Sequence, residues 1–451
     1  MNKEISCGQR SGRIRIPSSK SAAHRMLICA AFGDTPCVAE VEGFSKDNQA
    51  TLSCLEALGA GVEREQHTVR ITPVRRPFDT KPDSDLSDND SEIILHPGES
   101  GSTLRFLLPV TGITGKRAVF LTEGRLGSRP LAPLDRVLQE HGMKITRDSE
   151  RVICEGRLTP GKYSLPGNVS SQYFSALLMT LPLLEGESTL SVEGELESAP
   201  YVALTEEVLH RAGIRLEKPD ERSWRIPGGQ IPHLPERLCL EGDWSNAAFF
   251  LCMGALSEEG IVAEGLDFAS RQGDREILTL LQAFGAEIRR VTIEDGAGEA
   301  MIVKKKSRLP IRVDASQIPD LVPTLAALAC AAEGESVIEN AARLRLKESD
   351  RIRSTAGMIR ARGGEVEELP DGMRIFGHGS LRGGTVQAEN DHRIAMSAAV
   401  AASICESNVT VEGAECVEKS YPAFWRDLES LCLRGGENTQ QSRNGKKERD
   451  A

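Results

Sequence analysis

The stretch Pro17–Arg25 contains three serines, Lys20 and Arg25, and it directly precedes the apolar run Met26–Phe32. Serine is a favoured N-cap residue, so this pattern predicts a helix that begins here with unpaired backbone N–H groups in its first turn. The helix dipole disfavours a cation at this end unless an anion lies between the two. Ser21 and Arg25 are four residues apart and can face one ligand. Alone, the stretch fits either an ordinary capped helix with solvated cations or a site for a phosphate or carboxylate.

The densest run of charge in the chain is Arg343–Arg351. Within it, Lys347 and Arg351 are four residues apart and share a helix face, and Glu348 lies three residues before Arg351. A charge run of this kind is usually a solvated face. Its interpretation therefore depends on where the other polar clusters of the chain are placed.

Polar clusters precede small-residue apolar helices six times, at intervals of roughly 70 to 80 residues. The six clusters begin at Ser18, Gly101, Ser170, Asp243, Asp320 and Asp391. A second marker, a helix end followed by Gly and an alternating strand, keeps the same spacing at Gly59, Gly142, Gly213, Gly285 and Gly363. We expect each of these glycines to end its helix in a left-handed conformation. Two markers with one period indicate repeated units, whose polar helix starts can face one shared place.

Two domains are expected, because 451 residues exceed the roughly 250 to 300 residues at which single cores stop growing. Six helix starts but five helix-Gly-strand elements leave the last unit incomplete, since no strand is expected behind the helix that ends near Leu428. Two strands near the N-terminus, Lys3–Ser6 and Gly12–Ile16, lack partners, and we expect them to complete the sixth unit. We therefore expect three units per domain and two chain crossings. One domain should contain residues 1–17 and 242–433, and a middle domain should contain residues 18–241. We also expect a solvated insertion at 75–92 and a disordered tail at 434–451.

The composition narrows the class of function. A net charge of −11 argues against nucleic acid or an anionic membrane as a partner of the whole surface. Residues 1–16 show no apolar run typical of a signal peptide and no later stretch is apolar for about 20 residues, so we expect a cytoplasmic protein. The 11 cysteines occur without a C-x-x-C pair and the histidines without H-x-x-x-H spacing, which predicts reduced core thiols and no metal site.

Three motifs together resemble the EPSP synthase family (3-phosphoshikimate 1-carboxyvinyltransferase), over nearly the whole chain up to Leu428. They are Ser18-Ser19-Lys20-Ser21-x-x-x-Arg25, Leu346-Lys347-Glu348-Ser349-Asp350-Arg351 and Asp391-His392-Arg393-Ile394-Ala395-Met396. The resemblance implies an α/β fold of two inside-out domains, each with three repeated β-α-β-α-β-β units and with the active site in the cleft between them. It implies transfer of the enolpyruvyl group of phosphoenolpyruvate to the 5-hydroxyl of shikimate 3-phosphate, with release of phosphate, by a monomer that needs no metal or organic cofactor.

The same resemblance assigns candidate residues. The positions that match the phosphoenolpyruvate site are Lys20, Gly101, Arg129, Gln172, Arg351, Arg393 and Lys419. The positions that match the phosphoshikimate site are Ser21, Arg25, Ser170, Ser171, Gln172, Ser198, Tyr201, Asp320 and Lys347. Asp320 and Glu348 match the proton-transfer carboxylates. The reaction needs a base for the 5-hydroxyl proton, for which we expect Asp320, and an acid for the methylene carbon, for which Glu348 and Lys20 are both candidates.

Two departures from the family pattern affect local substrate contacts: Glu99 and Arg343 each stand where the family usually has Asn. Gly101 keeps the small residue that the family links to glyphosate sensitivity, so we predict inhibition that is competitive with phosphoenolpyruvate. The sister enzyme UDP-N-acetylglucosamine enolpyruvyl transferase is the nearest alternative, but the Cys typical of it is missing from 122–129. A non-catalytic phosphosugar-binding protein is a second alternative, against which the paired carboxylates argue.

Overall fold

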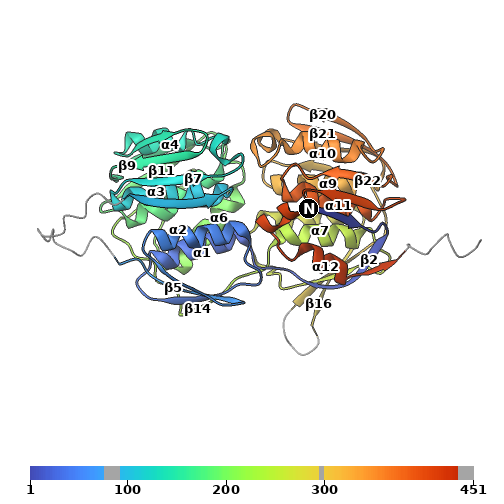
Figure 1. The fold of residues 1–451 in the computed structure, drawn as a ribbon, viewed down its shortest axis with the longest axis horizontal. Coiled ribbons are helices and arrows are strands. Elements are labelled where there is room, and N and C mark those ends of the chain that lie inside the picture. Colours follow the sequence, from blue (N-terminus) through green and yellow to red (C-terminus); the bar gives the residue numbers. More distant parts are fainter. Residues whose placement is uncertain (76–91, 294–298, 435–451) are drawn as a thin grey trace, which may run out of the picture.

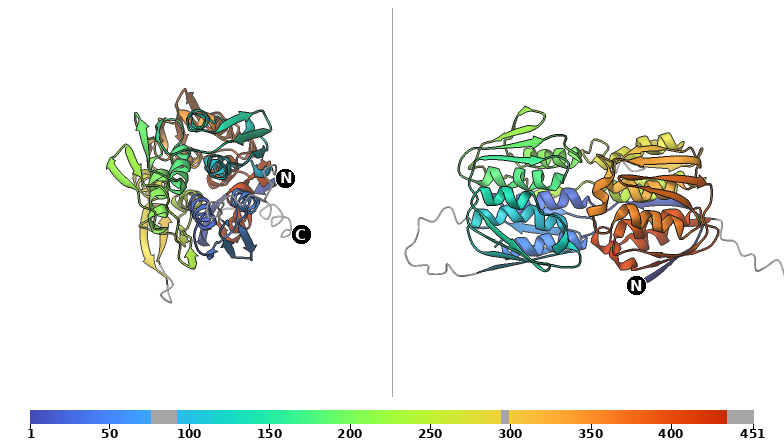
Figure 2. Two further views of the ribbon diagram at one scale, coloured as in Figure 1. Left: turned by 90° about the vertical axis from the view of Figure 1, so that its left-hand side faces the viewer. Right: turned by 90° about the horizontal axis from the view of Figure 1, so that it is seen from above.

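The computed structural model describes residues 1–75, 92–293 and 299–434 as two lobes of mixed α/β structure that lie side by side (Figure 1). Each lobe has its own hydrophobic core. One core draws on residues 5–16 and 244–431, and the other on residues 23–240. We call the first the terminal lobe and the second the middle lobe. The second view in Figure 2 shows the same two bodies with the chain passing between them.

Each lobe has three helices at its centre, and these helices are buried on nearly every side. They are α1 (Lys20–Ala31), α3 (Gly101–Thr114) and α5 (Ser171–Thr180) in the middle lobe, and α7 (Trp244–Ala255), α9 (Val322–Ala329) and α11 (His392–Ala402) in the terminal lobe. Helices that are apolar all round belong inside a protein. Their small and apolar residues therefore explain why helices lie inside and sheets outside, as the family resemblance implies.

Six small sheets surround these helices. The middle lobe has β14 (Arg237–Cys239), β3 (Cys37–Glu40), β5 (Thr68–Thr72) and β4 (Gly61–Arg64), then β6 (Ile93–Gly98), β7 (Ala118–Thr122), β9 (Arg151–Glu155) and β8 (Lys144–Arg147), then β10 (Lys162–Pro166), β11 (Ser188–Glu193), β13 (Ser223–Ile226) and β12 (Glu217–Asp220). The terminal lobe has β16 (Glu287–Thr292), β17 (Glu299–Lys304), β15 (Ile261–Glu264), β2 (Gln9–Arg15) and β24 (Cys432–Arg434), then β18 (Arg312–Asp314), β19 (Glu333–Glu339), β21 (Gly372–His378) and β20 (Glu365–Leu369), then β22 (Gly384–Gln387), β23 (Val409–Glu412) and β1 (Asn2–Ile5).

The repeated unit predicted from the sequence is present. In each four-stranded sheet the first strand pairs with the second in parallel and the remaining two pair antiparallel. A second set of helices follows the second strands: α2 (Lys46–Ala57), α4 (Leu134–Glu140), α6 (Ala199–Arg211), α8 (Ile277–Phe284), α10 (Arg351–Arg360) and α12 (Phe424–Ser430). The five glycines expected to end helices all have positive φ: Gly59, Gly142, Gly213, Gly285 and Gly363. That part of the prediction is confirmed.

The expected closure of the sixth unit is right for one N-terminal strand and wrong for the other. Strand β1 pairs antiparallel with β23 and completes the sixth sheet. Strand β2 instead pairs in parallel with β15 of the fourth unit. Strand β14 does the same in the middle lobe, where it pairs in parallel with β3 of the first unit. Each strand that precedes a crossing thus belongs to a sheet of the lobe that the chain is leaving. Strand β14 therefore serves as the first strand of the first unit, and β2 serves as the first strand of the fourth unit.

The C-terminal end also differs from the sequence expectation. A strand, β24, follows α12 and pairs antiparallel with β2, with Gln9 opposite Arg434. Arg434 was expected to begin the disordered tail but is the last residue of this strand. Residues 435–451 of that tail and 76–91 of the expected insertion lie outside the described residues.

The two chain crossings lie against each other. Ser18 and Gly242 form an antiparallel bridge. The Ser19 N–H donates to the Glu241 carbonyl at 2.7 Å, and the Asp243 N–H donates to the Pro17 carbonyl at 2.9 Å. The two crossings are therefore joined to each other by backbone hydrogen bonds and are not two independent linkers. Among the described residues, no helix is long and apolar enough to span a membrane, and no three His, Cys, Asp or Glu side chains are grouped to hold a metal ion.

Candidate active site

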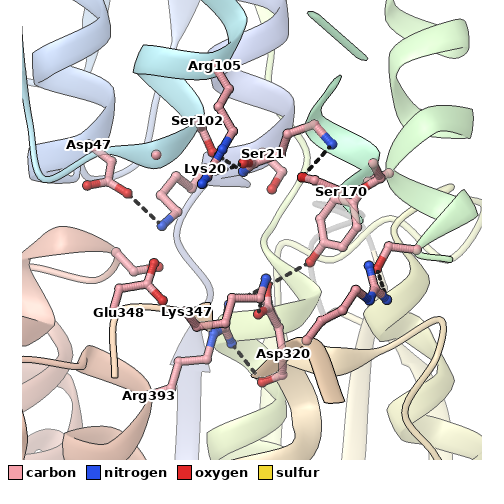
Figure 3. Close-up of a pocket in the computed structure, with 18 of the residues that line it drawn as sticks. Lys20, Ser21, Asp47, Ser102, Arg105, Ser170, Asp320, Lys347, Glu348 and Arg393 are labelled. Carbon is pink, nitrogen blue, oxygen red and sulfur yellow. Dashed lines mark hydrogen bonds and ion pairs between the residues drawn. The ribbon is translucent and has the colours of Figure 1, made fainter. Parts of the chain in front are cut away.

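A cavity between the two lobes collects the predicted residues. The members that line it are Lys20, Ser21, Arg25, Gly101, Arg129, Ser170, Ser171, Gln172, Ser198, Tyr201, Asp320, Lys347, Glu348, Arg351 and Arg393. Eight Lys or Arg side chains line the cavity against five carboxylates, in a chain whose net charge is −11. The cavity is thus a local cationic site, drawn in close-up in Figure 3.

The inner helices aim their N-termini at this cavity. Ser19, Ser100, Ser170, Asp243 and Asp391 each accept a hydrogen bond from a backbone N–H in the first turn of the following helix. The fifth helix start differs, because it is a single 3-10 turn, Pro319–Leu321, that carries Asp320. Five capped starts and one turn from two lobes converge, which is the arrangement that the periodic polar clusters predict.

Lys20 lies at the boundary between the lobes. Its Nζ pairs with Asp47 Oδ2 at 2.9 Å, a contact marked in Figure 3. Its backbone N–H donates to Asp243 Oδ2 at 3.0 Å, while Asp243 Oδ1 accepts the Asn246 N–H at 2.8 Å. One buried carboxylate therefore caps the first helix of each lobe and fixes the backbone of Lys20 beside the chain crossings.

The middle lobe contributes a cluster of guanidinium groups around Gly101. Arg105 Nη1 donates to Gln172 Oε1 at 2.8 Å, and Gln172 Nε2 donates to Ser102 Oγ at 2.9 Å. A Cβ placed on Gly101 would lie 2.6 Å from Arg105 Nη1 and 2.9 Å from Arg129 Nη1. The missing side chain of Gly101 therefore leaves the room in which these two cations stand. Burial lowers the pKa of Arg105 to about 10, so it stays charged at neutral pH.

Asp320 lies among three cations of the terminal lobe. Arg351 Nη1 is 2.8 Å from Asp320 Oδ1, Arg393 Nη2 is 3.3 Å from Oδ2 and Lys347 Nζ is 3.8 Å from Oδ1. Tyr201 of the middle lobe donates its hydroxyl to Oδ2 at 3.0 Å. Burial alone would raise the pKa of Asp320, but the surrounding cations hold it well below its usual range. Asp320 is therefore ionised at neutral pH.

Glu348 faces the opposite side of the cavity, toward Lys20 (Figure 3). Arg351 Nη2 is 2.6 Å from Glu348 Oε2, and Arg129 Nη1 of the middle lobe is 3.5 Å from Oε1. Burial opposes ionisation here too, yet these cations hold the pKa of Glu348 well below its usual range. Arg351 also contacts Asp391 at 2.8 Å. Three carboxylates thus share this one guanidinium, which is 1% exposed.

Two further cations differ in how much of their charge is free for a ligand. Arg25 donates to Thr205 Oγ1 at 2.6 Å, to Ser21 O at 2.7 Å and also to Ser175 and Tyr201. Most of its donors are therefore used within the protein. Among the described residues, the one ion pair of Lys347 is the 3.8 Å contact with Asp320, and burial lowers the pKa of Lys347 to about 8.

Lys419 is the one predicted site residue that is not among the described residues lining the cavity. Its Nζ lies 2.8 Å from Glu99 Oε2 and donates to the Asn390 carbonyl at 2.8 Å. Asn390 Nδ2 also donates to both Glu99 oxygens, at 3.1 and 3.0 Å. Glu99, which replaces the Asn usual in the family, thus binds the cation that the resemblance assigned to phosphoenolpyruvate.

Sequence reasoning missed some lining residues, most clearly Asp274. Asp274 Oδ2 accepts a hydrogen bond from the Ser245 hydroxyl and lies 3.3 Å from the Tyr201 hydroxyl oxygen. Burial, together with the nearby charge of Asp320, raises the pKa of Asp274 to about 6. Asp274 lies in the short turn Gly273–Glu276 outside the six helix starts, so its spacing gave no signal. Asp47, also missed, follows the N-cap of α2 and looks like an ordinary first-turn acid.

The chain is similar to known proteins over nearly its whole length. The family model described as EPSP synthase (3-phosphoshikimate 1-carboxyvinyltransferase) matches residues 7–428. The 3-phosphoshikimate 1-carboxyvinyltransferase of Clostridium acetobutylicum is 39% identical over 426 residues, which cover 93% of this chain and 95% of that protein. The protein of the same name from Clostridium kluyveri is 39% identical and covers 94% and 95%.

Solved structures show the same fold. An EPSP synthase structure from Acinetobacter baumannii matches with a TM-score of 0.75 at 24% identity and covers 95% of this chain and 97% of that one. The enolpyruvyl transferase NikO from Streptomyces tendae matches with a TM-score of 0.72 at 20% identity, covering 94% and 96%. The two-lobed inside-out fold expected from the sequence is thereby confirmed.

Proposed function

This chain belongs to the EPSP synthase family, and from that premise we propose which of its residues bind each substrate and which move the protons. The family reaction transfers the enolpyruvyl group of phosphoenolpyruvate to shikimate 3-phosphate in aromatic amino acid biosynthesis, and the chain is a transferase of this kind. Addition of the 5-hydroxyl to the enol double bond gives a tetrahedral phospho-ketal. Elimination of phosphate then restores the double bond in the product.

We assign phosphoenolpyruvate to the space between Lys20, Arg129 and Arg393, and shikimate 3-phosphate to the side of the cavity with Ser170 and Lys347. The geometry that supports this is the convergence of helix N-termini and unpaired guanidinium N–H groups. Buried Nε atoms of Arg105, Arg129 and Arg393 have no hydrogen-bond partner among the described residues. Two multiply charged anions can be desolvated side by side only where fixed cations and dipoles replace their water.

Asp320 is the base that removes the 5-hydroxyl proton. Its low pKa keeps it ionised, and its contacts with Lys347 and Tyr201 place it where the two lobes meet. A carboxylate with a very low pKa is a weak base. The cations that depress it also face the substrate anions, so bound substrate competes for those cations and brings the pKa of Asp320 back toward its usual range.

Glu348 or Lys20 protonates the methylene carbon. Glu348 is ionised in the ligand-free protein because Arg351 and Arg129 lie beside it. Phosphoenolpyruvate bound to the same guanidinium groups would weaken that stabilisation and raise the pKa of Glu348. Lys20 starts from the opposite condition, because its ammonium group already carries the proton that an acid donates. Its Nζ lies 2.9 Å from Asp47 Oδ2.

Phosphate release from both substrates together tests the assignment. The wild-type protein releases phosphate only when both are present. We expect Asp320→Asn and Glu348→Gln to lower kcat by at least about a hundredfold, the usual contribution of a general acid or base, while both variants still bind shikimate 3-phosphate. Unchanged turnover in Asp320→Asn would remove it as the base. Turnover with UDP-N-acetylglucosamine in place of the phosphoshikimate would instead favour the sister activity, and binding of both substrates without any release would favour a binding protein.

We also propose that glyphosate inhibits the enzyme in competition with phosphoenolpyruvate, because the missing side chain of Gly101 leaves the room in which the anion-binding groups of Arg105 and Arg129 stand. An apparent KM for phosphoenolpyruvate that does not change with glyphosate would contradict this. All described residues that line the cavity come from one chain, and we propose a monomer as the active form. Sedimentation at the assay concentration tests that, and cell fractionation tests the expected cytoplasmic location.

A further inference from the structure

Asp274 lies in the wall of the cavity, where the terminal lobe touches the start of α6 in the middle lobe. Its turn, Gly273–Glu276, follows Gln272, whose side chain is hydrogen-bonded to the backbone at and just before the start of α7. A Cβ placed on Gly273 would lie 2.8 Å from Pro200 Cβ in α6. The absence of that side chain therefore lets the turn reach α6, which brings the Asp274 carboxylate to Tyr201.

One tyrosine hydroxyl joins Asp274 to Asp320, which Figure 3 labels. The Tyr201 oxygen is 3.0 Å from Asp320 Oδ2 and 3.3 Å from Asp274 Oδ2, and it can donate its single proton to only one of them at a time. The Ser245 hydroxyl also donates to Asp274 Oδ2. Asp274 Oδ1 is buried and has no hydrogen-bond partner among the described residues. The two carboxylates and the phenol thus form a continuous path for a proton.

The electrostatic surroundings of the two carboxylates differ, although both are buried. Burial and the charge of Asp320 raise the pKa of Asp274 to about 6, while Arg393 opposes the rise. Against the effect of burial, the cations around Asp320 hold its pKa well below the usual range. Burial and both carboxylates raise the pKa of Tyr201, so the phenol keeps its proton. The groups that face Asp274 are Asp320, Arg393, Asp243, Ser245 and Tyr201. A proton on this path is therefore more stable on Asp274 than on Asp320.

We propose that Asp274 stores the proton that Asp320 removes from the 5-hydroxyl, and that Tyr201 passes it between the two carboxylates. This inference rests on the proposed role of Asp320 as the base. Asp274 acts through Tyr201 and touches no substrate in this scheme, so it is a positioning residue for proton transfer. The path compensates for the weakness of a base with a low pKa, because the proton need not stay on Asp320.

The proton balance closes with the groups present. The 5-hydroxyl O–H bond breaks as its oxygen bonds to the enol carbon, and the proton bonds to Asp320. A proton then moves from Asp320 Oδ2 to the Tyr201 oxygen while the phenol proton moves to Asp274 Oδ2, so Asp320 and Tyr201 regain their starting states. The methylene carbon gains a proton in the addition and loses it in the elimination. When the C–O bond to phosphate breaks, the stored proton returns along the path and leaves as part of hydrogen phosphate.

The pH dependence of kcat with both substrates saturating tests the proposal, since phosphate monoesters themselves titrate near pH 6 and would obscure kcat/KM. Wild-type kcat should fall as the pH drops through the pKa of Asp274, at or above about 6, because protonated Asp274 accepts no further proton. Asp274→Asn should remove that fall and lower kcat about tenfold at about pH 7.5, less than the hundredfold or more typical of a direct base, with both KM values changed less than about twofold. Asp274→Glu, which keeps a carboxylate, should recover part of kcat and of the fall.

A double-variant cycle tests the path itself. Tyr201→Phe removes the shared hydroxyl and should also remove the fall of kcat at low pH. Because the proton passes through this hydroxyl, Asp274→Asn should lower kcat no further in the Tyr201→Phe protein. The matched control is Glu276→Gln, which removes an exposed carboxylate from the same turn and should leave kcat, its pH profile and the melting temperature unchanged.

Three results would overturn the proposal. The first is an Asp274→Asn protein with wild-type kcat. The second is a lowered kcat that still falls at low pH, together with a lower melting temperature, which would mean that Asp274 only supports the structure. The third is a pair of losses, from Asp274→Asn and Tyr201→Phe, that multiply in the double variant. Unchanged turnover in Asp320→Asn would instead refute the base on which the inference rests, and that outcome is measured independently of Asp274.

Discussion

Gly101 shows how a missing side chain can set the affinity of an anion site. A Cβ at this position would lie within 3 Å of Arg105 Nη1 and Arg129 Nη1. Arg105 is anchored by Gln172 and the Pro130 carbonyl, so Arg129 is the group that must move. We therefore expect Gly101→Ala to raise the KM for phosphoenolpyruvate about tenfold (about 1.4 kcal/mol) and to leave the KM for shikimate 3-phosphate unchanged.

A matched control is Gly357→Ala, because Gly357 is exposed in α10 and its added Cβ would meet no atom within 4 Å. Removing a helical glycine should raise the free energy of unfolding by about 0.5 to 1 kcal/mol and leave both KM values unchanged. Steady-state kinetics and thermal unfolding of the two variants separate steric displacement of Arg129 from a general effect of alanine. Equal KM values for phosphoenolpyruvate in Gly101→Ala and wild type would contradict the prediction.

Lys347 should give the enzyme an alkaline limit. Burial lowers its pKa to about 8, so the free enzyme loses this charge as the pH rises through about 8. We expect kcat/KM for shikimate 3-phosphate to fall across that range, and Lys347→Arg to move the fall to higher pH because arginine keeps its proton. In the folded protein the lysine binds fewer protons than in the unfolded chain between pH 8 and 10.5, so its contribution to the free energy of unfolding increases over that interval. A pH profile unchanged in Lys347→Arg would exclude this lysine as the titrating group.

Sequence spacing predicted which residues meet in the cavity when those residues lie on one helix or at the repeated helix starts. Ser21 and Arg25 lie one helical turn apart, and the helix starts repeat, so their convergence could be anticipated from the sequence. Asp274 could not, because it contributes through a turn outside the repeat. The pairing of Lys419 with Glu99 could not be anticipated either, since it joins side chains 320 residues apart across the two lobes. Sequence spacing predicts local geometry, whereas such partners depend on how the finished lobes meet.

At the scale of elements, the fourth sheet depends on the N-terminal strand. Strand β2 lies between β15 and β24, and its Ile14 belongs to the terminal core together with Ile5 and Ile16. Deleting residues 1–16 removes this strand and β1, and it exposes a core for which each lost large side chain costs about 2 to 5 kcal/mol. We expect the terminal lobe to become protease-sensitive and to lose its cooperative transition, while the middle lobe keeps its own.

A substitution on the same strand provides the control for that deletion. The Arg13 side chain is 61% exposed and pairs with Glu264, so Arg13→Ala should change the free energy of unfolding by less than about 0.5 kcal/mol. Limited proteolysis with calorimetry distinguishes the two. A deletion protein whose terminal lobe still unfolds cooperatively at the wild-type temperature would show that β2 is not needed to close that lobe.

The repeat of these elements could be predicted because each unit carries its own local signals, namely a helix cap, a glycine stop and an alternating strand. The exchange of β2 and β14 could not be predicted, because a parallel partner is not marked in the strand itself. Residues Gly12–Arg15 pair with Ile261–Glu264, about 250 residues away in sequence. Such a pairing depends on the lobe to which the strand belongs. That assignment requires the three-dimensional arrangement of all six units and cannot be read from the strand alone.

At the scale of the whole molecule, charge is distributed unevenly. The chain is acidic overall, yet eight cations face the cavity. At physiological ionic strength the Debye length is about 8 Å, so the acidic outer surface hardly weakens the attraction of the cavity for anions. Within the cavity the cations repel one another unless carboxylates or ligands lie between them. Asp320 and Glu348 therefore neutralise cations of the cavity when no substrate is bound, as in the ion pairs Arg351–Asp320 and Arg129–Glu348. Bound substrates take over part of that role.

Two cores joined by two short crossings should unfold separately when no ligand links them. We expect calorimetry of the ligand-free protein to show two transitions, one for each lobe, since the buried hydrophobic residues form two separate cores. Shikimate 3-phosphate and phosphoenolpyruvate bound together contact both lobes and should merge these transitions. At a hundred times the Kd, a ligand of the native state adds about 2.7 kcal/mol. Ligands that raise one transition and leave the other unchanged would show that the substrates bind to a single lobe, and they would refute the placement of both substrates in the cavity between the lobes.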